Sequence, residues 1–237
     1  MVKTELIKKS PLRKLDSSIH GGLGAGNIGV IASRRGIGKT ACLVHIATDK
    51  LMAGKYVIHV SYAKRVNHII NWYEDIFKEI SLKRNLENAM EIHNELVHNR
   101  VIMNFSQRGT SVKQVIAGVT AMIENAQSET DVIVVDGFDF TKAESSDIST
   151  FKKFAVTKSI ELWFTDDYHR DDIDGPILNE RGMPTNLVPF LEQIDIVITL
   201  KAEKDYLHLY LTKDHDTINT EDLPLKLDPK SLLIADV

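Results

Sequence analysis

The apolar residues of this 237-residue chain form short continuous runs that alternate with longer amphipathic stretches. A continuous apolar run of a few residues is typical of a strand buried on both faces. Apolar positions three and four residues apart indicate a helix. The alternation of the two patterns predicts an α/β fold with a twisted, mostly parallel sheet flanked by helices.

The predicted strands and helices follow one another along the whole chain. Strands are expected at residues 28–32, 56–61, 101–105, 131–136, 160–165, 194–200 and 206–213. Helices are expected at residues 39–52, 66–80, 84–98 and 112–126. Gly54 is a suitable stop for the first helix. Residues 166–186 are polar and rich in Asp, Gly and Pro, which predicts a loop, and residues 223–237 are a candidate edge strand.

Composition and charge narrow the class of protein. Hydrophobic residues make up 43% and charged residues 26%, which excludes the disordered, collagen-like and membrane classes. Cys42 is the only cysteine, so we expect no intramolecular disulfide and a cytoplasmic setting. We expect one domain over residues 1–237, with a basic extension at 1–14 and a tail at 223–237. The net charge of −4 argues against a strongly basic nucleic-acid surface.

The most informative segment is residues 33–40, which read Ser-Arg-Arg-Gly-Ile-Gly-Lys-Thr between a predicted strand and a predicted helix. In that context the pattern predicts a phosphate loop, although its first position is Ser33 instead of the usual Gly. Gly36 and Gly38 allow the backbone N–H groups to approach phosphate, while Lys39 would reach the β- and γ-phosphates. The expected nucleotide contacts are Arg35, Gly36, Ile37, Gly38, Lys39, Thr40 and Ala41.

Asp136 ends the apolar run 131–136 and is the natural partner of this loop. A carboxylate at that strand end would meet the water shell of a Mg²⁺ ion that the Thr40 hydroxyl also holds. We therefore predict Thr40 and Asp136 as the magnesium site, with Asp139 as a weaker candidate. The alternative is that Asp136 only forms a turn or caps a helix.

These segments, in their order, resemble the RecA-fold ATPases. The likeness begins at Leu15-Asp16 and Gly21-Gly22-Leu23, continues through residues 29–41 and 131–136, and extends to residues 164–170, 186–200 and 206–215. It is greatest to the C-terminal motor domain of DnaB-type replicative helicases, with the KaiC-like ATPases next. The resemblance implies ATP or ADP with Mg²⁺ at the carboxyl ends of the strands, and a ring of subunits with nucleotide between them.

The chain departs from this family where the chemistry of hydrolysis is done. The family's general base is a Glu just after the second strand, where this chain has Tyr62 and Ala63, and neither accepts a proton from water at neutral pH. Glu74 or Asp75 could replace it only from well within the following helix.

Two further positions of the family pattern are altered. The Lys-x-Arg pair that reaches a neighbouring subunit's γ-phosphate reads Lys213-Asp214-His215 here, and an imidazole cannot form the bidentate clamp of a guanidinium. The polar residue that senses the γ-phosphate corresponds to Asp166 or Asp167, whose negative charge would repel phosphate. No catalytic residue is assigned; Asp136 and Lys213 are the remaining candidates.

We therefore expect a nucleotide-binding regulator or assembly component with weak or absent ATP hydrolysis. One alternative is an active DNA-dependent ATPase, such as a helicase or recombination accessory. The acidic loop at 166–186 counts against it, because carboxylates repel the phosphates of single-stranded nucleic acid. The other alternative is a phosphotransferase, which would need an acceptor pocket beside the phosphate loop. No membrane partner is expected.

Overall fold

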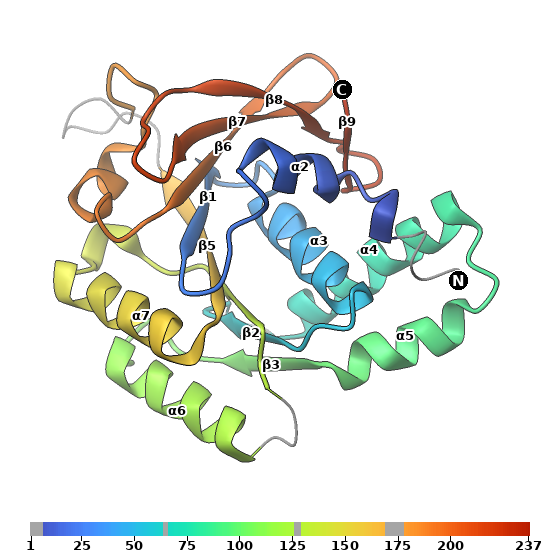
Figure 1. Cartoon of the computed structure of the whole chain (residues 1–237), viewed down its shortest axis with the longest axis horizontal. Helices are drawn as coiled ribbons and strands as arrows, with labels where there is room; N and C mark the ends of the chain where they lie inside the picture. Colours follow the sequence, from blue (N-terminus) through green and yellow to red (C-terminus); the bar gives the residue numbers. More distant parts are fainter. Residues whose placement is uncertain (1–6, 64–65, 126–128, 169–177) are drawn as a thin grey trace.

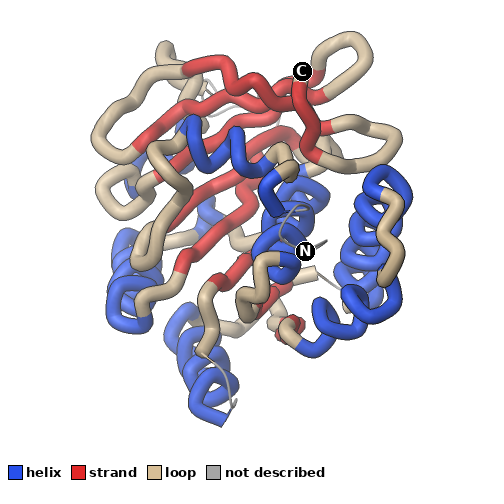
Figure 2. Tube along the Cα trace, turned by 45° about the vertical axis from the view of Figure 1, so that its right-hand side comes forward, coloured by secondary structure: helices blue, strands red, loops and turns tan. Residues whose placement is uncertain are grey.

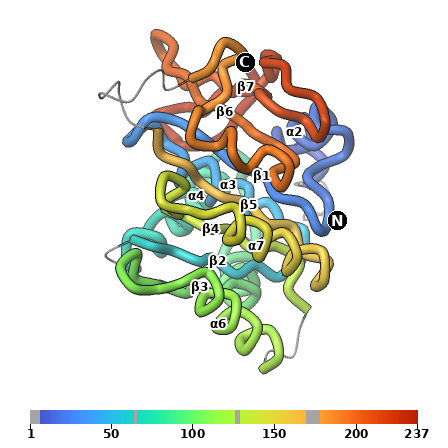
Figure 3. Tube along the Cα trace, turned by 90° about the vertical axis from the view of Figure 1, so that its left-hand side faces the viewer, coloured from blue at the N-terminus to red at the C-terminus, as the bar shows by residue number. Residues whose placement is uncertain are grey.

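The computed structural model describes residues 7–63, 66–125, 129–168 and 178–237. Within these residues the strands form one nine-stranded sheet, and Figure 3 shows most of its strands one above another. The strands are β1 (Ile28–Arg34), β2 (Val57–Ser61), β3 (Arg100–Asn104), β4 (Val132–Asp136), β5 (Glu161–Tyr168), β6 (Ile196–Ala202), β7 (Leu207–Asp214), β8 (Glu221–Leu227) and β9 (Ile234–Asp236). Their order across the sheet is β3-β2-β4-β5-β1-β6-β7-β8-β9.

The first six strands of that order run parallel, which confirms the prediction from the apolar runs. Every residue of β2 is buried, as expected of a strand that is covered on both faces. Three antiparallel strands, β7 to β9, extend the sheet beyond β6. The predicted edge strand in the tail is therefore present as β8 and β9.

Helices cover both faces of the sheet and create two hydrophobic cores (Figures 1 and 2). The larger core joins α2, α3, α4 and α5 to one face, and the second core joins α6 and α7 to the other. The helices are α2 (Leu12–Ser18), α3 (Lys39–Met52), α4 (Asn67–Arg84), α5 (Ala89–His98), α6 (Val112–Asn125) and α7 (Ser145–Lys158), with 3₁₀ turns η1 (Phe140–Lys142) and η2 (Thr185–Phe190). No helix in the described ranges is long and apolar enough to span a membrane.

The helices α3, α4, α5 and α6 lie close to their predicted positions, and Gly54 follows α3 as expected. Asn85 takes up a left-handed backbone conformation after α4, so the next helix begins at Ala89 and not at residue 84. Ile70, an apolar residue of α4, is 38% exposed. Two helices were not predicted, α2 and α7.

The expected loop at residues 166–186 is the main correction to the predicted elements. β5 continues through Asp166 and Asp167 to Tyr168, because β1 also continues to Arg34 and the two strands stay paired to that point. At the other end, η2 begins at Thr185. The middle of the predicted loop, with its carboxylates at 171, 172 and 174, lies outside the described residues.

Candidate nucleotide-binding site

The predicted phosphate loop is a tight turn between β1 and α3 at the carboxyl edge of the parallel strands. Gly36 and Gly38 have φ angles of 80° and 105°, and Gly38 is the residue that precedes the first turn of α3. Side-chain-bearing residues rarely adopt these angles, so the turn requires glycine at both positions. The helix terminus and the backbone N–H groups of such a turn form a site suited to an anion.

The remaining predicted contacts flank the two glycines in different environments. Arg35 is exposed and lines a cavity of about 340 Å³ in front of the loop. Ile37 is partly buried against the larger core, and Ala41 is fully buried in it. Apolar contacts with the larger core therefore hold one side of the loop, and Arg35 on the other side faces the cavity.

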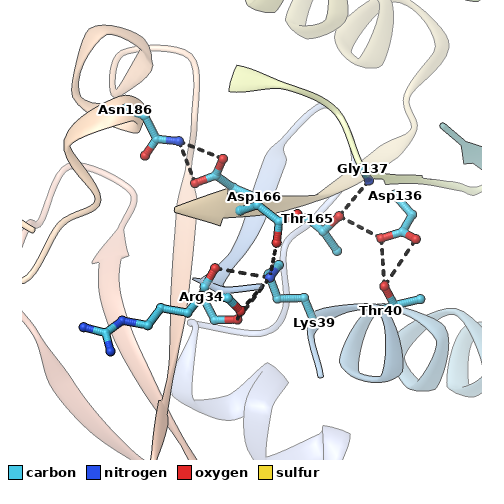
Figure 4. A network of polar contacts seen from close by, with 10 residues as sticks. Arg34, Lys39, Thr40, Asp136, Gly137, Thr165, Asp166 and Asn186 are labelled. Carbon is cyan, nitrogen blue, oxygen red and sulfur yellow. Dashed lines mark hydrogen bonds and ion pairs between the residues drawn. The ribbon is translucent and has the colours of Figure 1, made fainter. Parts of the chain in front are cut away.

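Lys39 is held at the base of the loop by acceptors from the chain itself (Figure 4). Its side chain is 7% exposed. Its ammonium group donates to the Ser33 carbonyl and hydroxyl oxygens at 3.2 Å and to the Arg34 carbonyl at 3.1 Å. It also forms an ion pair of 2.5 Å with the Asp167 carboxylate.

Thr40 and Asp136, the predicted magnesium pair, are in direct contact. The Thr40 hydroxyl donates to the Asp136 carboxylate at 3.1 Å, across the gap between α3 and the end of β4 (Figure 4). Thr165 adds a second hydroxyl at 2.8 Å from the same carboxylate and accepts a hydrogen bond from the Gly137 backbone at 2.9 Å. Burial raises the pKa of Asp136, and the hydrogen bonds from Thr165 and Thr40 oppose that rise.

The oxygen ligands in this contact fit a magnesium ion. Mg²⁺ prefers hydroxyl, carboxylate and phosphate oxygens and keeps several of its waters. Thr40 and Asp136 would supply the protein's share of such a shell. Among the described residues no group of three or more His, Cys, Asp or Glu side chains could hold a metal. The remaining positions of a magnesium shell at this contact would therefore be filled by water or by a bound ligand.

Asp166 and Asp167, the predicted counterparts of the γ-phosphate sensor, both line the cavity in front of the loop. Asp166 is 1% exposed, and the Asn186 side-chain amide donates to both of its oxygens, at 2.8 and 2.9 Å. Burial raises the pKa of Asp166 to about 7. Asp167 is 45% exposed at its side chain and contacts Lys39.

At the position where the resemblance predicts a general base, the described residues are Tyr62 and Ala63. Burial raises the pKa of Tyr62 to about 12, and the Ala63 backbone N–H donates to the Ser61 hydroxyl. Glu74 lies 3.8 Å from Arg100, at the start of β3 and hence at the edge opposite to the phosphate loop. Asp75, its neighbour on α4, is exposed.

Lys213 lies toward the amino-terminal end of the parallel strands, whereas the phosphate loop lies at their carboxyl-terminal end. It pairs with Val197, which pairs with Val30 near the start of β1, whereas the loop follows the end of β1. Its ammonium group donates to the His215 carbonyl oxygen. Lys213 and Asp136 are therefore not parts of one site within a single chain.

Comparison with known proteins places this geometry in a known architecture. No protein-family model and no curated protein matches the sequence. An ATPase domain of known structure aligns with a TM-score of 0.66 at 16% identity, over 94% of this chain and 89% of that one. The chain has the RecA-like fold of a DnaB-type ATPase domain.

A second solved structure, of a DnaB-like replicative helicase and its interactions with primase, also gives a TM-score of 0.66 at 16% identity. The match covers 94% of this chain, which spans 60% of the helicase chain. At this identity the likeness is one of fold. The chemistry of the site rests on the residues themselves.

Thr165 and Asn186 are the site residues that the sequence did not reveal. Thr165 could have been found, because it is the polar residue next to Asp166 at the end of a strand that neighbours β4. Asn186 lies twenty residues beyond Asp166 and reaches it only through the path of the intervening chain. No local pattern encodes that contact.

Proposed function

We propose that this chain binds ATP or ADP with Mg²⁺ and hydrolyses ATP slowly or not at all, acting as a nucleotide-dependent regulator or assembly component. The observation that carries the proposal is the convergence of Lys39, Thr40 and Asp136 at one strand edge. A lysine, a hydroxyl and a carboxylate in that arrangement match the groups that hold phosphate and magnesium in phosphate-loop proteins.

Slow hydrolysis is supported by the hydrogen bonds and ion pairs that already engage the carboxylates around the loop. Asp136 accepts hydrogen bonds from two threonines, and Asp167 is paired with Lys39. Asp139 is paired with Lys142 at 2.5 Å. Asp166 has a pKa near that of a useful base, but the Asn186 amide already donates to both of its oxygens, which an attacking water would have to use.

The decisive experiment is isothermal titration of the protein with ATP and with ADP in the presence of Mg²⁺. The Lys39→Ala variant removes the ammonium group that would contact phosphate, so we expect binding to weaken by roughly tenfold or more. The matched control is Lys78→Ala, which removes an exposed lysine from α4. Absence of binding in the wild-type protein would overturn the proposal.

Turnover is then measured on the same samples, with and without single-stranded DNA. We expect a rate well below ~1 s⁻¹, the lower end of common enzyme turnover. A faster rate that disappears in Lys39→Ala would show an active ATPase. A rate that rises when DNA is added would favour the DNA-dependent alternative.

A specific observation also favours phosphotransfer as a second candidate. A cavity of about 750 Å³ lies between the amino ends of α6 and α7, lined by Tyr62, Phe138, Arg108 and other residues. It shares Asp139 and Lys142, among others, with the smaller cavity in front of the loop. Its volume suits a small molecule. Transfer of the γ-phosphoryl group to an added acceptor, rather than to water, would identify this activity.

A further inference from the structure

We propose that Asp167 makes this site select a nucleoside diphosphate over a triphosphate. The inference rests on the proposed nucleotide binding and adds the preference between the two ligands. It starts from the surroundings of the Lys39 ammonium group. Four oxygen atoms lie within 3.2 Å of it, and the nearest belongs to Asp167.

An ammonium group has three N–H donors. The four acceptor oxygens, two from Ser33 and one each from Arg34 and Asp167, therefore share all three of these donors. Because the lysine of a phosphate loop reaches the β- and γ-phosphates, either nucleotide competes with Asp167 for Lys39, and a triphosphate does so with one more phosphate group. The carboxylate therefore acts as a built-in anion at the place where the phosphate chain would end.

The register of the sheet fixes Asp167 in this place. Ser33, the first residue of the loop, is paired with Asp167 in the β1–β5 ladder, and Ala32 is paired with Asp166. The Asp167 carboxylate is thus part of a strand end beside the loop. Its position follows from backbone pairing in the centre of the sheet.

The charged residues in front of the loop lie where the γ-phosphate of a triphosphate would be, and a diphosphate lacks that group. A β-phosphate can rest on the backbone N–H groups of the turn around Gly36 and Gly38, which both ligands use. A γ-phosphate would extend toward the cavity lined by Asp139, Asp166 and Asp167. Although Arg35 and Lys142 line the same cavity, Lys142 is already paired with Asp139. A γ-phosphate that enters this cavity therefore has to compete with the Asp167 carboxylate for Lys39, and the exposed Arg35 offsets only part of that cost.

The test compares the dissociation constants of ATP and ADP at a fixed Mg²⁺ concentration in the wild type and in Asp167→Asn. Asparagine keeps the size of the side chain and removes its charge. We expect the wild type to bind ADP roughly tenfold more tightly than ATP. In Asp167→Asn we expect the affinity for ATP to rise roughly tenfold and the affinity for ADP to rise at most about threefold.

The matched control is Asp205→Asn, which removes the same charge from the exposed turn between β6 and β7. It should leave the ratio of the two constants unchanged. An ATP-to-ADP ratio that is the same in the wild type and in Asp167→Asn would overturn the selectivity while leaving nucleotide binding intact. Absence of binding of both nucleotides in every variant would instead overturn the proposed function.

Discussion

Asp166 is a carboxylic acid in surroundings that oppose its charge. It is buried at the end of β5, where Asn186 donates to both of its oxygens. Burial is the largest cause of the rise in its pKa from 3.8 to about 7. The negative charges of Asp167 and Asp139 act in the same direction, whereas the hydrogen bond from Asn186 and the charge of Lys39 oppose it.

The raised pKa makes stability depend on pH in a defined direction. A carboxyl whose pKa is higher in the folded state favours folding below its unfolded pKa, and that contribution is lost as the pH rises through the folded pKa. For Asp166 the loss falls between 3.8 and about 7. The complete shift corresponds to about 4 kcal/mol at most.

We therefore expect Asp166→Asn to stabilise the protein relative to the wild type near pH 8 by on the order of 2 kcal/mol, and by much less near pH 5. Urea unfolding at both pH values measures the difference between the two proteins. Asp205→Asn serves as the surface control. A difference that does not change between the two pH values would contradict the buried, charge-opposing environment.

At this scale the sequence predicts only what a local motif carries. Lys39 and Thr40 belong to a motif of fixed spacing, and Asp136 ends an apolar strand, so all three could be placed beforehand. The Asp167–Lys39 ion pair depends on the register of two strands far apart in the sequence. The sequence indicated that this aspartate lies near the phosphate loop, but it did not predict the ion pair with the lysine of the loop.

At the scale of elements, a histidine joins the last strand to the central helix. His45 lies on α3 and is buried, and its Nδ1 atom accepts a hydrogen bond of 2.9 Å from the Ile234 backbone N–H at the start of β9. Burial lowers the pKa of His45 to about 3, and the charges of Arg84 and Lys83 add to the effect. The histidine is therefore neutral and can accept at neutral pH.

Replacing His45 by leucine should leave the Ile234 N–H buried without an acceptor. We expect a loss of about 1–3 kcal/mol in the free energy of unfolding near pH 7, and faster hydrogen exchange at Ile234. Because folding lowers the pKa of His45, the neutral side chain stabilises the folded state above its unfolded pKa of 6.5. This stabilisation is lost as the pH falls from 6.5 toward about 3. The difference in the free energy of unfolding between the variant and the wild type should thus become smaller near pH 4.

The matched control is His68→Leu, which makes the same exchange at an exposed position of α4. It should change neither the exchange rate at Ile234 nor the pH dependence of stability. Unchanged exchange at Ile234 in the His45 variant would show that β9 is held by its pairing with β8 alone.

The elements were predictable to different degrees for physical reasons. Buried parallel strands have to be continuously apolar, and that pattern is visible without knowledge of the fold. The helix α7 was overlooked although Ile148, Phe151 and Ala155 follow a helical spacing. Its signal at the start was the reciprocal cap between Glu144 and Asp147, in which each side chain accepts from the backbone of the other. β9 has only three residues, so the sequence indicated a strand in the tail but not where β9 begins and ends.

At the scale of the whole molecule, Lys39 and Lys213 lie at opposite ends of the parallel strands, although the RecA resemblance implies that both kinds of residue act on one nucleotide. Lys39 lies at the carboxyl edge of the parallel strands, and Lys213 lies beside the start of β1 at the opposite edge. A side chain cannot cross the length of the sheet. Any influence of Lys213 on a nucleotide bound at Lys39 would therefore need a second copy of the chain.

This separation makes a prediction that depends on protein concentration. In a dilute sample that sediments as a monomer, Lys213→Ala should leave the dissociation constant of ADP within about twofold of the wild type, because the two lysines share no site. Lys39→Ala, measured in parallel, should weaken binding by roughly tenfold or more under the same conditions. Sedimentation velocity at each concentration identifies the species that is being titrated.

Raising the concentration then separates two arrangements of the copies. If copies meet edge to edge, Lys213 of one can lie near the phosphate loop of the next, and the Lys213→Ala variant should bind more weakly than the wild type only where the oligomer is present. If the chain oligomerises elsewhere or stays monomeric, the two proteins should bind equally at every concentration. Weaker binding by the monomeric Lys213→Ala variant would contradict the placement of Lys213 at the far edge, because the loss would then arise within one chain.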